Sequence, residues 1–160
     1  MSIIDASNVR VKIPISVLVV IHNANGDVLL IERADRPGFW QSVTGSLDFL
    51  DEPTREAAIR EVFEETGIDI TALPADALQD MQHAVDYVIY PDWRYRYAPG
   101  VTSNCEHWFS LLVPINTVVR LAPREHTAFE WLPFTEAAKR CFSDSNTAAI
   151  LRLQAQNAAE

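Results

Sequence analysis

The sequence predicts an α+β fold in which a mixed β-sheet lies between helices. Apolar segments of strand type stand on both sides of one acidic segment of helix type, and two more helical segments follow near the C-terminal end. The 160 residues are 48% hydrophobic and 22% charged, as is typical of globular proteins. A chain of this length buries a core without disulfides or structural metals, so we expect one domain over residues 1–160.

The strands are predicted from β-branched and alternating apolar runs. Ile13–Ile21 predicts a buried strand, and Asn25-Gly26 predicts a tight hairpin turn into a second strand over 28–32. A short strand over 40–44 leads into a loop. Further strands are expected over 83–90, 107–113 and 128–132.

The first helix is expected over 53–66. Pro53 suits a first helical turn, where its missing N–H costs nothing, and Gly67 suits a helix end. Residues 68–70 are expected to begin another extended stretch, and two C-terminal helices are expected over 135–141 and 146–157.

Composition argues against several classes of partner. The net charge of −9 disfavours nucleic acid and an anionic membrane surface. The longest apolar stretch, over 15–21, is too short to span a bilayer, and the first residues show no secretory signal pattern. Cys105 and Cys141 have neither metal spacing nor a disulfide framework, which favours a reducing cytoplasm.

The acidic helix carries the strongest functional signal. Glu61, Glu64 and Glu65 stand at offsets of three and four, which bring side chains to nearly one helix face. No lysine occurs between Lys12 and Lys139 to relieve their repulsion. Because hard oxygen ligands suit Mg²⁺ or Mn²⁺, the pattern predicts a divalent metal site. The alternative is a solvated helix face, which is the usual role of an acidic run.

At these positions the chain resembles the Nudix hydrolase family. The family signature is a glycine, five residues, a glutamate, seven residues, and then Arg-Glu-U-x-Glu-Glu-x-Gly-U, where U is aliphatic. Gly45 is separated from Glu52 by six residues, so the loop that opens the signature is one residue longer here, while the helix register is intact. The matching positions are Glu52, Arg60, Glu61, Val62, Glu64, Glu65, Gly67 and Ile68.

The resemblance implies an α/β/α sandwich and metal-dependent hydrolysis of a diphosphate linkage. In that chemistry Glu61, Glu64 and Glu65 hold one or more Mg²⁺ ions at the substrate phosphates. Arg60, a fixed charge with several N–H donors, orients Glu52 or a ligating glutamate. The alternative for Arg60 is an ordinary surface ion pair on the helix.

Segments outside the signature resemble the Nudix enzymes that hydrolyse dihydroneopterin triphosphate, over roughly residues 12–155. The resemblance implies a small-molecule triphosphate substrate, which is hydrolysed to dihydroneopterin monophosphate and pyrophosphate in folate biosynthesis. Two alternatives stay open: a nucleoside or dinucleoside polyphosphate hydrolase with the same site, and a Nudix-fold binding module without turnover. The segments are Lys12–Val20, Trp40–Gly45, Arg96–Thr102, Glu106–Phe109 and Glu125–Trp131.

The same resemblance assigns further residues. Glu125 is implied as a metal ligand outside the helix, although an acidic loop residue is usually solvated. Lys12 and Arg33 are implied as triphosphate contacts, and Thr44 and Ser143 as further hydrogen-bonding groups. The residues implied to border the heterocycle are Tyr87, Val88, Ile89 and Tyr90.

Aromatic residues and histidines have structural explanations as well. The aromatic residues of segment 87–97 could stack on a flat ring, but strands favour aromatics in any case, and at least half of them are expected to pack within the protein. The histidines lack a mutual spacing that predicts a metal site, so His22, His83, His107 and His126 are interpreted as structural or surface residues. The sequence carries no indication of the oligomeric state.

Overall fold

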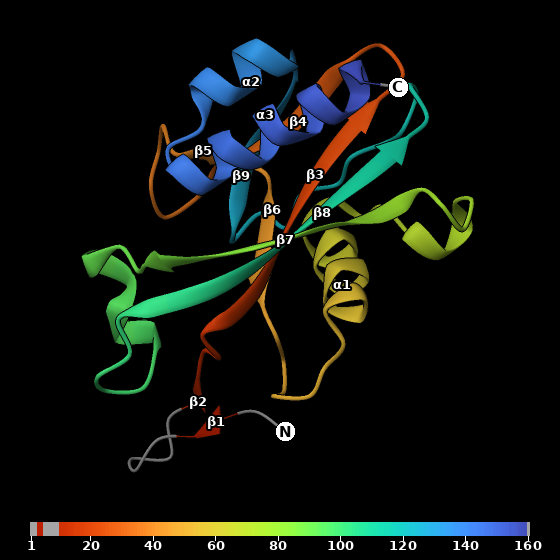
Figure 1. Cartoon of the computed structure of the whole chain (residues 1–160). Coiled ribbons are helices and arrows are strands. Elements are labelled where there is room, and N and C mark those ends of the chain that lie inside the picture. Colours follow the sequence, from red (N-terminus) through yellow and green to blue (C-terminus); the bar gives the residue numbers. More distant parts are fainter. Residues whose placement is uncertain (1–2, 5–9, 160) are drawn as a thin grey trace.

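The computed structural model describes residues 3–4 and 10–159 (Figure 1). Its helices are α1 (Thr54–Thr66), α2 (Phe134–Arg140) and α3 (Asp144–Ala158), with 3₁₀ turns η1 (Ile70–Ala72) and η2 (Pro91–Arg96). Its strands are β1 (Ile3–Ile4), β2 (Arg10–Val11), β3 (Ile15–Asn23), β4 (Asp27–Arg33), β5 (Trp40–Gln41), β6 (Val43–Ser46), β7 (Leu78–Val88), β8 (Ser103–Val113) and β9 (His126–Pro133).

The large sheet is mixed and is centred on β3. This strand runs parallel to β8 in a continuous register, and β7 pairs antiparallel on the other side of β8. β3 and β4 pair at His22 and Val28, next to the hairpin turn. Beyond this point β3 pairs with β6, whereas β4 pairs with β9. The central strands β3 and β4 therefore each pair with a different strand, β6 or β9, beyond the hairpin turn.

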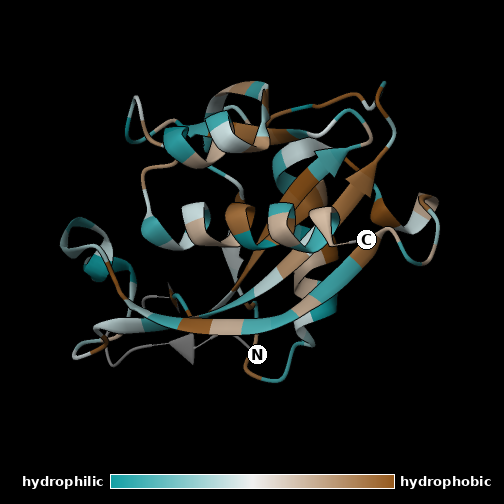
Figure 2. Cartoon of the chain, turned by 45° about the horizontal axis from the view of Figure 1, so that its top comes forward, coloured by the Kyte–Doolittle hydropathy of each residue, from teal (hydrophilic) through white to brown (hydrophobic). Residues whose placement is uncertain are grey.

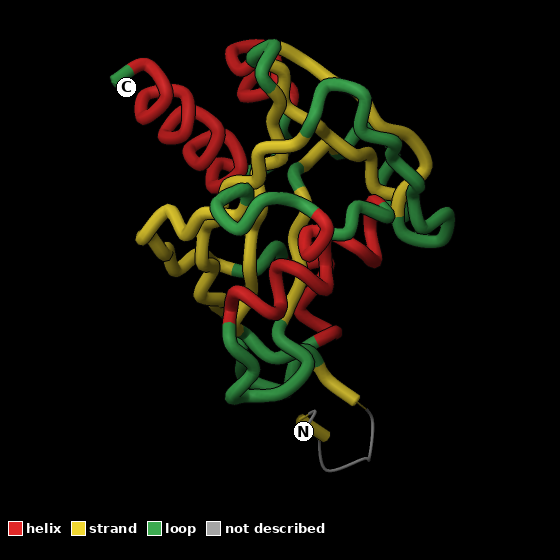
Figure 3. The backbone as a smooth tube through the Cα atoms, turned by 90° about the vertical axis from the view of Figure 1, so that its right-hand side faces the viewer, coloured by secondary structure: helices red, strands yellow, loops and turns green. Residues whose placement is uncertain are grey.

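Helices cover both faces of the sheet because β3 is apolar on both sides. Successive side chains of a strand point to opposite faces. Val17, Val19 and Ile21 belong to the hydrophobic cluster that includes α1, whereas Leu18 and Val20 belong to the cluster that includes α2 and α3. Figures 1 and 3 show the strands between these helices, and Figure 2 shows that the central strands are mostly hydrophobic. The expected sandwich, with a mixed sheet between helices, is confirmed.

The predicted helix with the glutamates is present, with a shift of one residue at its start. It begins at Thr54, with Pro53 as the N-cap residue, and ends at Gly67, whose φ of 75° lies in the left-handed region. None of the helices in the described part of the chain is long and apolar enough to cross a membrane. Cys105 and Cys141 are free thiols.

The expectation of an extended stretch at residues 68–70 was wrong. Oδ1 of Asp69 accepts hydrogen bonds from the backbone N–H of Thr71 at 3.0 Å and from the Thr71 hydroxyl at 2.6 Å. A short acidic side chain that bonds to the backbone two residues later favours a turn. The chain therefore enters the 3₁₀ turn η1 in place of a strand.

The strand expected over 83–90 has different ends. It begins at Leu78 and ends at Val88, so that residues 89–90 lie outside it. Pro91 then opens η2, because proline has a fixed φ and no N–H to donate to a strand ladder.

We expect Ile150→Ala to lower the free energy of unfolding by about 2–4 kcal/mol, because Ile150 is fully buried between α3 and the sheet. Leu151→Ala is the matched control: this side chain is 45% exposed, so its loss is expected to be under about 1 kcal/mol. Urea unfolding followed by circular dichroism measures both. Equal losses would contradict the packing of α3 described here.

Candidate active site

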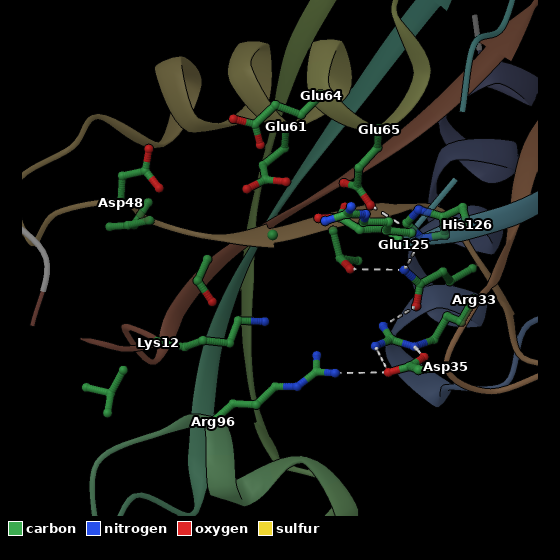
Figure 4. A pocket seen from close by; sticks show the side chains of 17 residues that line it. Lys12, Arg33, Asp35, Asp48, Glu61, Glu64, Glu65, Arg96, Glu125 and His126 are labelled. Atoms are coloured by element: carbon green, nitrogen blue, oxygen red, sulfur yellow. Dashed lines mark hydrogen bonds and ion pairs between the residues drawn. The ribbon is translucent and has the colours of Figure 1, made fainter. Parts of the chain in front are cut away.

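Of the three clustered glutamates of α1, two lie in the interior. Glu61 and Glu65 are one turn apart, with side chains 13% and 3% exposed, whereas the side chain of Glu64 is 53% exposed. Figure 4 shows Glu61 and Glu65 reaching from α1 into a pocket, with Glu64 beside them. A solvated helix face therefore describes Glu64 but not the other two.

Arg60 joins α1 to the loop that precedes it. Its Nε and Nη2 donate to the carboxylate of Glu52 at 3.1 and 3.0 Å, and Nη2 also donates to the Ser46 carbonyl at 3.1 Å. Its Nη1 donates to Oε1 of Glu61 at 2.7 Å, and Oδ2 of Asp48 lies 3.1 Å from Nε. A guanidinium that bonds several carboxylates fixes their positions, so this contact set exceeds an isolated surface ion pair.

Gly45 allows the Glu61 carboxylate to lie against the sheet. It pairs with Val17 in the β3–β6 ladder, and a Cβ at position 45 would lie 2.0 Å from Cδ of Glu61. Any larger residue would displace that carboxylate. The lengthened loop between Gly45 and Glu52 keeps this close approach, and Asp48 N–H donates to Oε1 of Glu52 at 2.8 Å within it.

Glu125 and His126 meet Glu65 from the opposite wall of the pocket. One ligand atom from each of these three residues lies within 4.8 Å of the others, and His126 Nε2 is 3.5 Å from Glu65 Oε1. Among the described residues, Glu65 Oε2 and His126 Nδ1 are buried without a hydrogen-bond partner. Carboxylate oxygens and imidazole nitrogens are suitable ligands for a divalent cation, which would use the unpaired Glu65 oxygen.

The electrostatics of this cluster favour a bound cation. Burial raises the pKa of Glu61 to about 7, and burial together with the charges of Glu61 and Glu125 raises the pKa of Glu65 well above its ordinary value. Burial lowers the pKa of His126 to about 4, so its imidazole is neutral at neutral pH and has a lone pair available. A divalent cation would offset the repulsion and let the carboxyl groups ionise.

Two adjoining cavities lie at the site, and the cluster lines the first of them. One, of about 530 Å³, is lined by Glu61, Glu65 and Glu125, and the other, of about 510 Å³, is lined largely by aromatic and polar side chains. Positively charged side chains therefore lie at the boundary between the carboxylate-lined cavity and the aromatic one. The residues that line both cavities are Lys12, Arg33, Gln41, Thr44 and Arg96.

Asp35 holds the guanidinium groups of Arg33 and Arg96 in place, and a backbone hydrogen bond joins Lys12 to Arg96. Arg33 donates to both oxygens of Asp35 at 2.8 and 2.9 Å, and Arg96 donates to Asp35 at 3.0 Å (Figure 4). The Arg33 guanidinium also lies 4.3 Å from the ring centroid of Trp93. Lys12 N–H donates to the Arg96 carbonyl at 2.8 Å, and burial lowers the pKa of the Lys12 ammonium group.

The aromatic cavity has a packed wall of rings. Phe39 stacks on Phe142 with centroids 4.8 Å apart, and the ring of Trp93 lies 5.2 Å from that of Tyr90. The rings of Tyr90 and Trp93 thus pack against each other, although Tyr90 is 42% exposed. Both also line the cavity, so packing does not prevent contact with a ligand.

The structure brings the predicted metal and substrate residues to these two cavities. The roles assigned to them stay predictions. Arg60 and Glu52 lie behind Glu61, and Gly67 ends the helix. The predicted residues that line a cavity are Lys12, Arg33, Thr44, Gly45, Glu61, Glu64, Glu65, Tyr87, Val88, Ile89, Tyr90, Glu125 and Ser143.

Several residues of the site were missed in the sequence. Asp35 carried no signal, while Gln41, Arg96 and Glu106 stood in the segments that resemble related enzymes. His126 was interpreted as structural or surface, but it lies in the candidate metal cluster. The useful signal was its place directly after Glu125, because its partners are carboxylates and not other histidines.

Comparison with known proteins agrees with this geometry. The chain is 44% identical over 140 residues to dihydroneopterin triphosphate diphosphatase from Escherichia coli (strain K12), covering 87% of this chain and 91% of that protein. It is 40% identical over 136 residues to the Haemophilus influenzae protein of the same name, with 84% of each covered.

Solved structures give the same result. The E. coli dihydroneopterin triphosphate pyrophosphohydrolase matches with a TM-score of 0.80 at 44% identity, over 88% of this chain and 94% of that chain. A Caenorhabditis elegans Ap4A hydrolase matches with a TM-score of 0.69 at 20% identity, over 91% and 98% of the two chains, which shows a shared fold. The NUDIX domain model matches residues 12–152. The chain therefore belongs to the Nudix family.

Proposed function

We propose that this protein hydrolyses dihydroneopterin triphosphate to dihydroneopterin monophosphate and pyrophosphate, a step of folate biosynthesis. The observation that carries this proposal is the identity of 44% and 40%, over most of each chain, to enzymes named for this substrate. The site supports it, because a carboxylate-lined cavity for a metal and phosphates adjoins an aromatic cavity of a size suited to a ring.

Nudix hydrolases use a divalent metal, and Mg²⁺ is proposed here, with Mn²⁺ as the alternative. The residues that would hold it are Glu65 and Glu125, with Glu61 and Glu64 on the same helix and His126 as an added ligand. When bound, such an ion neutralises phosphoryl oxygens and lowers the pKa of water.

The chain's own groups position the reactants and move the proton. An ionised glutamate of α1 accepts the proton of the attacking water. Arg60 orients Glu61 through its bond at 2.7 Å. Lys12 and Arg33 face the triphosphate from the boundary between the cavities, and Thr44 lies beside them.

The ring occupies the second cavity in this proposal, bordered by residues 87–90 and by Ser143. A nucleotide hydrolase with the same site is the second candidate, since the triphosphate contacts would serve both substrates. We also propose a cytoplasmic location, supported by two free cysteines. The absence of nucleic-acid and membrane partners stays a prediction from the net charge of −9.

Binding of Mg²⁺ to the metal-free protein is expected to release protons at about pH 6.5. The folded pKa of Glu61, about 7, lies above its ordinary 4.5, so this carboxyl is partly protonated there and a cation displaces the proton. The pKa of Glu61 is higher in the folded protein than in the unfolded chain. The metal-free protein is therefore also expected to lose stability as pH rises from 4.5 through about 7.

Calorimetry of Mg²⁺ binding in two buffers of different ionisation enthalpy measures the released protons. Glu61→Gln is expected to release fewer, whereas Glu56→Gln, an exposed residue of α1, should match the wild type. Equal release from all three proteins would show that Glu61 does not face the ion.

The proposed substrate is tested by comparing kcat/KM for dihydroneopterin triphosphate with that for dATP. We expect the pterin to be preferred, with pyrophosphate as co-product, because a site that pairs with polar ring edges rejects a ring that leaves its buried groups unpaired. Lys12→Ala is expected to lower both values by a similar factor, since a cation at the cavity boundary contacts phosphate. Equal or higher kcat/KM for dATP would favour the nucleotide hydrolase, and orthophosphate as sole product would contradict the proposed release of pyrophosphate.

A further inference from the structure

Glu106 is a buried carboxylate in the wall of the aromatic cavity. It lies in β8 opposite Ser16 of β3 and Val85 of β7, and it is 2% exposed. Trp108, on the same face of the strand, packs in the hydrophobic cluster with α2 and α3. A carboxylate at the edge of such a cluster is costly unless its oxygens are hydrogen-bonded.

The contacts of Glu106 leave part of its acceptor capacity open. Oε1 accepts the indole N–H of Trp108 at 3.0 Å. Burial, the largest effect, raises the pKa of Glu106, while hydrogen bonds with the side chains of Trp108 and Ser145 lower it. Among the residues that the structure describes, no Lys, Arg or His forms an ion pair with Glu106. An ionised carboxylate has about four lone-pair sites, so a ligand could still donate to it.

The neighbouring polar groups are fixed by hydrogen bonds. Asn104, which is 1% exposed, donates from Nδ2 to Ser16 Oγ at 2.6 Å and to the Tyr87 hydroxyl at 3.2 Å. Tyr87 pairs with Asn104 across the β7–β8 ladder and lines the same cavity as Glu106. A preformed polar wall of this kind discriminates between ring edges more strongly than stacking does.

The positively charged side chains at the cavity boundary determine which end of a ligand lies near Glu106. Lys12, Arg33 and Arg96 line both cavities, so phosphates held there direct an attached ring into the cavity that contains Glu106. A carboxylate accepts two parallel bonds best from a ring N–H next to an exocyclic amino group. A pterin carries this edge, whereas adenine presents a ring nitrogen lone pair beside its amino group.

We propose that Glu106 is a specificity-determining residue that accepts hydrogen bonds from the ring N–H and the adjacent amino group of the pterin. The inference rests on the proposed function, since it names the group that reads the ring of that substrate. It adds to the site a residue that contacts neither the metal cluster nor the phosphates.

The test compares dihydroneopterin triphosphate with its 2-oxo analogue, in which a carbonyl oxygen replaces the amino group, and with dATP. The wild type is expected to favour the 2-amino compound over the 2-oxo compound by about 10- to 100-fold in kcat/KM, because the carbonyl would face a carboxylate.

Glu106→Gln keeps an oxygen for the Trp108 N–H and offers an NH₂ donor in place of the second acceptor. It is expected to lower kcat/KM for the 2-amino compound by about 10- to 100-fold, to leave that for the 2-oxo compound unchanged or higher, and to leave that for dATP unchanged. Glu136→Gln, an exposed residue of α2, is the control that should match the wild type.

An unchanged ratio between the 2-amino and 2-oxo compounds in Glu106→Gln would overturn the inference. A uniform fall for all three compounds, with a lower melting temperature, would assign Glu106 to structure. If the variant does not fold, the wild-type comparison still tests the inference. Equal kcat/KM for the 2-amino and 2-oxo compounds would show that the protein does not recognise the amino group, which would overturn the role of Glu106. A wild type that prefers dATP to both pterins would instead reject the proposed function.

Discussion

Burial of two carboxylates one helical turn apart is the constraint on which the site depends. Removing like charges from water is unfavourable unless cations or hydrogen bonds compensate. Arg60 compensates Glu61 from behind, through a bond at 2.7 Å, and ties it to Glu52. Glu65 has an unpaired buried oxygen and faces Glu125 and His126, so its compensation must come from the pocket side.

The sheet topology brings the parts of the site together from distant segments. β6 pairs with β3 and places Gly45 under the Glu61 carboxylate. β9 pairs with β4 and brings His126, at its start, toward α1. Because β3 and β4 pair with different strands beyond their turn, residues of β6 and β9 both line the pocket. The helices bury the strands on either face of the sheet.

The second cavity supplies what the carboxylates do not. Asp35 fixes Arg33 and Arg96 where the cavities meet, so the cations are in place before a phosphate arrives. Beyond them the packed rings of Phe39 and Phe142 form a wall against which a flat heterocycle can stack. The carboxylate-lined cavity and the aromatic cavity therefore adjoin each other at the site.

Local patterns determined which parts could be predicted from the sequence. The helix over 53–66 was predictable, because its glutamates and its terminal glycine lie in one continuous segment. The turn η1 was not, because the side-chain bonds of Asp69 outweighed the strand preference of its neighbours. The meeting of Glu65 with His126 depends on the pairing of β4 with β9, which no spacing along the chain reveals.

We propose that the buried carboxylates of α1 hold a divalent cation. Titration with Mn²⁺ followed by electron paramagnetic resonance tests it most directly, because free and bound Mn²⁺ are distinguished without turnover. We predict that Glu65→Gln weakens Mn²⁺ binding by about tenfold or more, whereas Glu56→Gln on the exposed face of the same helix leaves it unchanged. Equal Mn²⁺ affinity in the wild type and Glu65→Gln would contradict the claim.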